Sequence, residues 1–77
     1  DIWNITNGER ISTYAIEAPR GSRTIGMNGG AARRFALGDR VVIAAFVQMD
    51  AELARQHQPQ VSLLDEHNEI KTPSAAY

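Results

Sequence analysis

The residues IWNITNGER, from Ile2 to Arg10, carry the clearest β-strand and turn pattern of this chain. Ile2 to Ile5 alternates as a β-strand does, and Thr6-Asn7-Gly8 ends the strand. The Asn-Gly pair favours a tight hairpin because both residues tolerate positive φ. The returning strand is expected from Arg10 to Glu17, before Pro19, which cannot donate a hydrogen bond to a ladder. The stretch therefore predicts an antiparallel hairpin at the start of a β-rich chain.

Further short strands and two short helical segments follow along the chain. Strands are predicted at Thr24 to Met27, Arg40 to Val47, Val61 to Leu64 and Ile70-Lys71. The apolar run Val41 to Val47 indicates a strand that is covered on both faces. Helical segments are predicted at Ala31 to Phe35 and from an Asp50 cap through Gln56, before Pro59. The tail from Thr72 to Tyr77 has no periodicity and is expected to be frayed. Many short strands with glycine-rich turns favour one small closed β-barrel over residues 1–77.

Composition excludes several classes of protein. The chain has 77 residues, no cysteine and a formal net charge of −1, so a basic nucleic-acid surface is not expected. His57 and His67 form no recognisable metal-ligand set, and Val41 to Val47 is too short to cross a bilayer. No secretory leader is expected, and the lack of cysteine fits a reducing compartment. Without disulfides or metal, so small a domain is expected to gain stability by burial against another polypeptide.

Several motifs resemble the aspartate 1-decarboxylase family in order and in spacing. They are Ile2 to Arg10, Ser12-Thr13-Tyr14, Arg20-Gly21-Ser22, Met27-Asn28-Gly29-Gly30-Ala31-Ala32, Leu37-Gly38-Asp39, Pro59-Gln60-Val61 and Asp65 to Ile70. The resemblance implies a cytoplasmic, pyruvoyl-dependent lyase that converts L-aspartate to β-alanine for pantothenate synthesis. It also implies a six-stranded double-psi β-barrel with short connecting helices, assembled as a homotetramer with active sites between subunits. The family's pyruvoyl cofactor arises when a zymogen cleaves itself at a Gly-Ser bond, and the serine becomes the new amino terminus.

The 77 residues depart from the family pattern at their beginning. The family's opening segment, which carries the Gly-Ser cleavage site and a lysine of the active site, is absent, and the chain starts at Asp1. Gly21-Ser22 matches a different family position. We therefore expect an incomplete double-psi β-barrel that is active only with a pyruvoyl-bearing segment supplied from outside these residues.

Arg10, Thr13 and Tyr14 are the expected site residues of the hairpin. A guanidinium holds a carboxylate through two parallel hydrogen bonds, although a solvated strand arginine is the common alternative for Arg10. Tyr14 lies four residues further and thus on the same face of a regular strand, whereas Thr13 points the other way unless a bulge or a subunit seam intervenes. The resemblance implies that Arg10 binds the substrate carboxylate, that Thr13 contacts substrate and that Tyr14 donates the proton. A surface tyrosine is the alternative for Tyr14.

Asn28-Gly29-Gly30-Ala31 is the second expected part of the site. Glycines let a backbone approach a ligand closely, although an ordinary turn has the same composition. The resemblance implies that Gly29, Gly30 and Ala31 contact substrate and that Asn28 lies beside the pyruvoyl group. Gly30 stands where the family usually has alanine and is expected to loosen this loop.

Two other functions remain open from the sequence. One is a catalytically inactive barrel fragment or accessory subunit. The other is a small β-barrel binding module that uses the basic residues Arg33 and Arg34, with Arg40 nearby. A solvated face is the simpler interpretation of these arginines, since the chain's seven arginines are matched by nine acidic residues.

Overall fold

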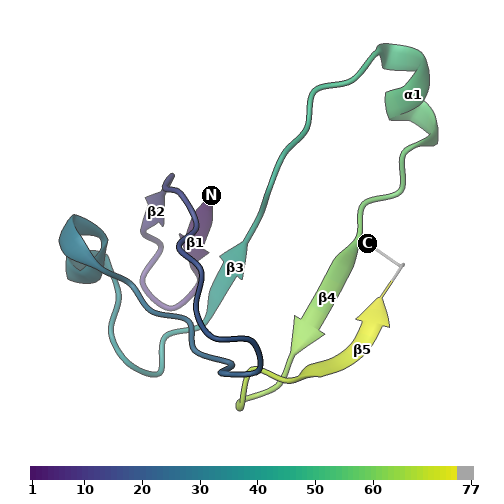
Figure 1. Ribbon diagram of the computed structural model, residues 1–77. Coiled ribbons are helices and arrows are strands. Elements are labelled where there is room, and N and C mark those ends of the chain that lie inside the picture. Colours follow the sequence, from purple (N-terminus) through teal and green to yellow (C-terminus); the bar gives the residue numbers. More distant parts are fainter. Residues whose placement is uncertain (75–77) are drawn as a thin grey trace. The chain divides into compact units, whose positions relative to one another are not determined.

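The computed structural model describes residues 1–74 and has short strands with two short helices (Figure 1). The elements are β1 (Ile2–Asn4), β2 (Arg10–Ile11), η1 (Gly29–Arg34), β3 (Val41–Ile43), α1 (Ala51–Gln56), β4 (Val61–Leu64) and β5 (Ile70–Ser74). The prediction of a mainly β chain with short connecting helices is confirmed. Contacts divide the chain into two units, Asp1–Ala18 with Ile25–Phe46 and Pro19–Thr24 with Val47–Tyr77.

The first unit begins with the predicted hairpin. β1 pairs with β2 in antiparallel register, with Trp3 opposite Arg10. The backbone N–H of Asn4 donates to the carbonyl of Glu9 at 2.7 Å, and Gly8 closes the turn with a φ of +81° that favours glycine. β2 ends at Ile11, so the prediction of a strand to Glu17 is wrong beyond that residue. Strand propensity alone supplies no ladder partner for the rest of this segment.

β3 pairs with the other edge of β1, which gives the sheet order β2-β1-β3. Asn4 lies opposite Val41 in this antiparallel pair. The prediction of a long strand covered on both faces is wrong, because β3 has three residues and both Val42 and Ile43 are exposed. An apolar run indicates where burial is favourable, but the described residues provide no second layer over it.

η1 is a 3-10 helix of six residues that confirms the predicted helical turn and begins two residues earlier. The strand predicted at Thr24 to Met27 is not formed in the described residues. Four residues are too few to fix a strand without a neighbouring partner.

The second unit contains α1 and the two-stranded sheet of β4 and β5. α1 begins after Asp50, as predicted, although the Asp50 side chain makes no capping hydrogen bond. β4 and β5 pair in antiparallel register with an irregularity between Ser62 and Leu64. β5 continues to Ser74, so the prediction that the tail frays from Thr72 is wrong for residues 72–74. The remainder of that prediction, residues 75–77, lies outside the described residues.

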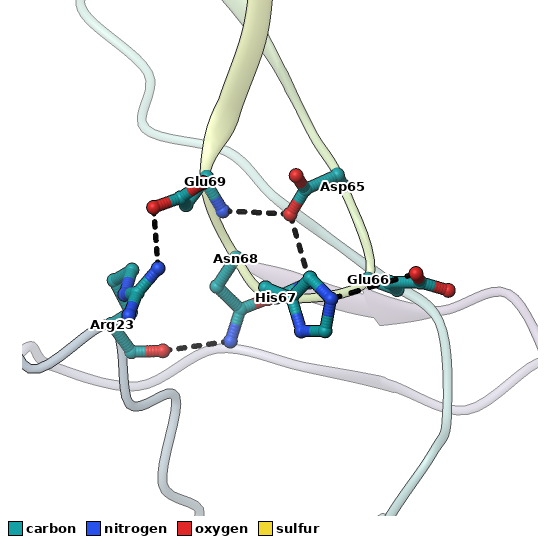
Figure 2. Close-up of polar contacts among 6 residues, drawn as sticks. All are labelled: Arg23, Asp65, Glu66, His67, Asn68 and Glu69. Carbon is teal, nitrogen blue, oxygen red and sulfur yellow. Dashed lines mark hydrogen bonds and ion pairs between the residues drawn. The ribbon is translucent and has the colours of Figure 1, made fainter.

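The turn between β4 and β5 is held by side-chain contacts (Figure 2). A carboxylate oxygen of Asp65 accepts hydrogen bonds from the backbone N–H groups of His67 at 2.8 Å and Glu69 at 3.0 Å. Glu69 forms an ion pair with Arg23, and the Asn68 amide donates to the Arg23 carbonyl at 2.8 Å. Arg23 and Asn68 both have positive φ, of 58° and 59°. These contacts join the turn to a segment more than forty residues earlier in the chain.

Burial within the described residues is sparse. Ile2 and Asn4 are the buried side chains among residues 1–71, whereas Tyr14, Leu37 and Phe46 are well exposed. No described helix has the length and apolarity needed to cross a membrane. These exposed apolar side chains are available for burial against further polypeptide.

Candidate active site

Arg10 is fixed by the hairpin above an aromatic ring. The register places it opposite Trp3, and its guanidinium carbon lies 4.6 Å from the centroid of the indole ring. Phe46 packs on the same indole with ring centroids 6.3 Å apart. A cation over an aromatic face gains about 0.5–1 kcal/mol at an exposed site, and stacking orients the planar fork. Arg10 forms no ion pair within the described residues.

A shallow recess of about 320 Å³ lies beside Arg10, and we call it the Arg10 recess. Its lining residues are Arg10, Ile11, Ser12, Thr13, Gly30, Ala31 and Arg34. One side therefore comes from β2 and the residues after it, and the other comes from η1. Four of the residues expected at the site, Arg10, Thr13, Gly30 and Ala31, are brought together here.

A regular strand would place Tyr14, and not Thr13, on the same face as Arg10, but the structure shows the reverse. Thr13 lines the recess with Arg10, whereas Tyr14 is 78% exposed and does not line it. The chain leaves the ladder after Ile11, so the alternation of strand side chains no longer applies to these two residues. The inference that Arg10 and Tyr14 share a strand face is therefore wrong, and the proton-donor role of Tyr14 stays a prediction.

Asn28 and Gly29 lie at the start of η1 and do not line the recess. Asn28 has extended backbone and makes no side-chain capping bond. Gly29 has a φ of +61°, which favours glycine. Gly30 needs no such conformation, and a Cβ added there would meet no atom within 4 Å. The backbone conformation at Gly29 thus favours glycine, whereas the space around Gly30 would accommodate a side chain.

Arg34 is a recess residue that the sequence placed only in a basic cluster. Its guanidinium pairs with the Glu9 carboxylate, so the last turn of η1 is joined to the hairpin by an ion pair. Its backbone carbonyl accepts hydrogen bonds from the side-chain amides of Asn4 at 3.1 Å and Asn7 at 2.9 Å. The sequence signal that could have placed Arg34 at the recess was its position two residues after Gly29-Gly30-Ala31-Ala32, because residues so close along the chain belong to the same short helix.

The turn before β3, which contains Asp39, is hydrogen-bonded to Asn4. The Asn4 amide donates to a carboxylate oxygen of Asp39 at 2.7 Å, and that oxygen also accepts the backbone N–H of Ala36 at 2.9 Å. These two donors, with Asn4 contributing more, hold the pKa of Asp39 below its usual value. Asp39 therefore remains ionised at neutral pH as part of the support of this unit.

The charge of the Arg10 recess favours an anionic ligand. Arg10 lines it without an ion-pair partner among the described residues, whereas Arg34, which also lines it, is paired with Glu9. The described residues contain no cluster of three or more histidine, cysteine, aspartate or glutamate side chains suited to a metal ion. An open hollow with an oriented guanidinium and small residues opposite can hold a small carboxylate compound.

Comparison with known proteins gives consistent matches along the chain. The family described as aspartate decarboxylase matches residues 1–71. The aspartate 1-decarboxylase of Hyphomonas neptunium is 70% identical over 74 residues, which cover 96% of this chain and 63% of that protein. The aspartate 1-decarboxylase of Maricaulis maris is 60% identical over 77 residues, covering 99% of this chain and 64% of that protein. The chain thus spans a little under two thirds of the length of these relatives.

Proposed function

Because the chain belongs to the aspartate decarboxylase family, we propose that it takes part in the decarboxylation of L-aspartate to β-alanine and CO₂. The observation that carries this proposal is the Arg10 recess, where an oriented guanidinium lies with Thr13 and the small residues Gly30 and Ala31. We propose further that the product serves pantothenate synthesis in the cytoplasm. The active form is a homotetramer whose sites lie between subunits.

The fold class agrees with this membership. The chain is mainly β with short helices, and its family has the six-stranded double-psi β-barrel. That all 77 residues form one incomplete domain of this barrel remains part of the proposal.

Arg10 is proposed to bind the carboxylate that the substrate retains. Two parallel N–H···O bonds from the fork fix both the position and the orientation of a carboxylate. The Arg10 Cζ atom lies 4.6 Å from the centroid of the Trp3 ring, and packing on an aromatic face favours one orientation of the guanidinium. The hollow of about 320 Å³ is large enough for a four-carbon diacid.

The other side of the recess supplies space and backbone. Gly30 and Ala31 carry little side-chain bulk, and nothing lies within 4 Å of a Cβ placed on Gly30. This opening fits a pyruvoyl group carried by a segment outside these residues, with Asn28 and Gly29 near it. Such a group supplies the carbonyl that reacts with the substrate amine and accepts electrons as CO₂ leaves.

Tyr14 is proposed to return a proton to the carbon that loses CO₂. A tyrosine hydroxyl carries its proton at neutral pH and can donate it to a strongly basic carbon. Its 78% exposure supports a site that is completed by another polypeptide, because a donor must be sheltered from water to act selectively. Thr13 is proposed to contact the same substrate from within the recess.

An inactive fragment or accessory subunit is the alternative that shares this fold. A binding module that uses Arg33 and Arg34 gains no support, because Arg34 is already paired with Glu9. The proposed enzyme and an inactive fragment or accessory subunit differ in whether a pyruvoyl group is present and whether β-alanine is produced.

The test uses the full-length protein and every polypeptide that co-purifies with it. Intact-mass measurement seeks a chain whose amino terminus has the mass of a pyruvoyl group, and an amino-acid assay follows β-alanine from L-aspartate. L-Glutamate, which is one methylene longer, is the matched control substrate. We expect the pyruvoyl mass and selective β-alanine production. A preparation with neither feature supports the inactive fragment and overturns the proposed function.

A further inference from the structure

Asn4 is the most deeply buried side chain among residues 1–71, with 2% of its surface exposed. Its amide nitrogen donates to the Arg34 carbonyl and to the Asp39 carboxylate. Its amide oxygen accepts the backbone N–H groups of Thr6 at 2.9 Å and Asn7 at 3.2 Å. An amide side chain has two N–H donors and one oxygen with two lone pairs, so every capacity of Asn4 is used.

These four bonds join three separate pieces of the first unit. Thr6 and Asn7 form the hairpin turn, Arg34 ends η1, and Asp39 precedes β3. The carbonyls at the end of a short helix lack partners within the helix. The Arg34 carbonyl finds them in two asparagine amides, those of Asn4 and Asn7, both from the hairpin. The hairpin therefore anchors η1 by its last residue.

The same two elements form the two sides of the Arg10 recess. The strand that leaves the hairpin carries Arg10 and Thr13, and η1 carries Gly30 and Ala31. Asn4 does not line the recess, yet its bond to Arg34 joins the element on one side to the element on the other. This bond therefore holds the two sides together, along with the Asn7 bond to the same carbonyl and the Arg34–Glu9 ion pair.

We propose that Asn4 is a positioning residue of the active site, which sets the distance between Arg10 and the Gly30-Ala31 backbone by holding the Arg34 carbonyl. The inference rests on the proposed function for its catalytic meaning. Asn7 assists from the exposed side of the same carbonyl. The carboxylate–amide pair of Asp39 and Asn4 stabilises the unit and does not set the recess.

Exchanges between asparagine and aspartate separate the contributions of Asn4, Asn7 and Asp39 with almost no change in side-chain volume. Asn4→Asp removes both donors and keeps the acceptor for the hairpin turn. Asn7→Asp removes the donor to Arg34 and keeps the oxygen that accepts the backbone N–H of Glu9 at 2.8 Å. Asp39→Asn is the matched control, because it alters the Asn4–Asp39 contact and leaves the bond to Arg34.

The experiment measures kcat, KM for L-aspartate and the inhibition constant of succinate in the full-length enzyme, together with Tm. Loss of one neutral hydrogen bond corresponds to roughly a threefold to tenfold change in an equilibrium constant. We expect Asn7→Asp to raise both KM and the succinate inhibition constant by about that factor. Asn4→Asp should raise both constants further, because it loses two donors and places a second carboxyl group against Asp39. Asp39→Asn should lower Tm and leave both constants within about twofold.

Several outcomes would overturn the inference. An Asn4→Asp enzyme with lowered Tm and unchanged KM would show a purely structural asparagine. If Asn4→Asp does not fold, Asn7→Asp decides, and unchanged constants in that exposed variant count against the proposal. If the wild-type enzyme makes no β-alanine, the proposed function fails separately. Hydrogen exchange then tests the anchor itself, with faster exchange expected in residues 29–34 of Asn7→Asp but not in residues 51–56, and equal exchange in both segments rejects it.

Discussion

The guanidinium of Arg10 lies over the indole of Trp3, with 4.6 Å between the Arg10 Cζ atom and the ring centroid. Cross-strand pairing places the two residues opposite each other, so the stack is a direct consequence of the hairpin register. It places the Arg10 guanidinium over an aromatic ring at the edge of the Arg10 recess. The proposed chemistry depends on this orientation, and substitution of either residue can test it.

Arg10→Lys in the full-length enzyme should weaken L-aspartate binding although the charge is preserved. Lysine has no planar fork to stack on Trp3 or to hold both carboxylate oxygens. We expect KM to rise about tenfold or more, as for the loss of a charge-assisted hydrogen bond. Steady-state kinetics checks this, with Arg33→Lys, outside the recess, as the matched control. Equal kinetic constants for Arg10→Lys and wild type would make Arg10 an ordinary surface residue.

Tyr14→Phe should impair proton return without impairing substrate binding. Phenylalanine keeps the ring and removes the hydroxyl, and Tyr14 does not line the recess that we propose for the substrate. We expect kcat to fall by about 10² to 10⁴, the usual range for general-acid catalysis, while inhibition by succinate stays unchanged. Steady-state rates and succinate titration on one preparation provide both readings. A near-normal kcat would remove Tyr14 as the donor, and weaker succinate inhibition would assign it to binding.

Gly29 and Gly30 should respond differently to alanine. Gly29 has a φ of +61°, so Gly29→Ala should lower the free energy of unfolding by about 1–2 kcal/mol. Gly30 has neither positive φ nor a neighbour within 4 Å of an added Cβ. Gly30→Ala should therefore be neutral or should stabilise the protein by up to about 1 kcal/mol, by restricting the unfolded chain. Denaturant unfolding of the full-length protein compares the two, and equal losses would contradict the assigned backbone conformations.

The turn between β4 and β5 should lose stability in acid through Asp65. Hydrogen bonds from the backbone N–H groups of Glu69 and then His67 hold the Asp65 pKa below its usual value near 3.8. A lowered folded-state pKa stabilises the protein above the unfolded value, and the contribution is lost as pH falls through the folded value. Asp65→Asn keeps an acceptor oxygen but cannot ionise.

The Tm difference between wild type and Asp65→Asn should thus shrink as the pH is lowered from 7 to about 3. Asp50→Asn is the control, since the Asp50 side chain makes no capping hydrogen bond. A Tm difference for Asp65→Asn that stays constant over this range would show that the Asp65 charge plays no part in the turn.

The 77-residue chain by itself should not persist as a folded monomer at micromolar concentration. Tyr14, Leu37 and Phe46 are exposed, and Ile2 is the buried apolar residue among residues 1–71. The β2-β1-β3 sheet also has two free outer edges within the described residues, which favours association. Sedimentation velocity and a thermal melt test this. A monomer with a cooperative melt would contradict the expectation.

Elements that depend on neighbouring residues could be predicted from the amino-acid sequence. Asn7-Gly8 predicts a hairpin because both residues accept positive φ, and the structure has a hairpin between β1 and β2 in which Gly8, but not Asn7, has positive φ. α1 lies between Asp50 and Pro59 as predicted, although the Asp50 side chain makes no capping hydrogen bond. Family motifs along residues 1–71 likewise predicted the family and its mainly β class.

The set of residues that line the Arg10 recess depends on pairing between distant parts of the chain and could not be predicted from local pattern. β2 ends after Ile11 because no partner strand continues the ladder, and this places Thr13, not Tyr14, beside Arg10. Asn4 reads as an ordinary strand residue, yet it binds the Arg34 carbonyl thirty positions away. Turns depend on the φ and ψ preferences of adjacent residues, whereas strand length and the burial of a polar amide depend on distant partners. Those partners are brought together only when the chain folds.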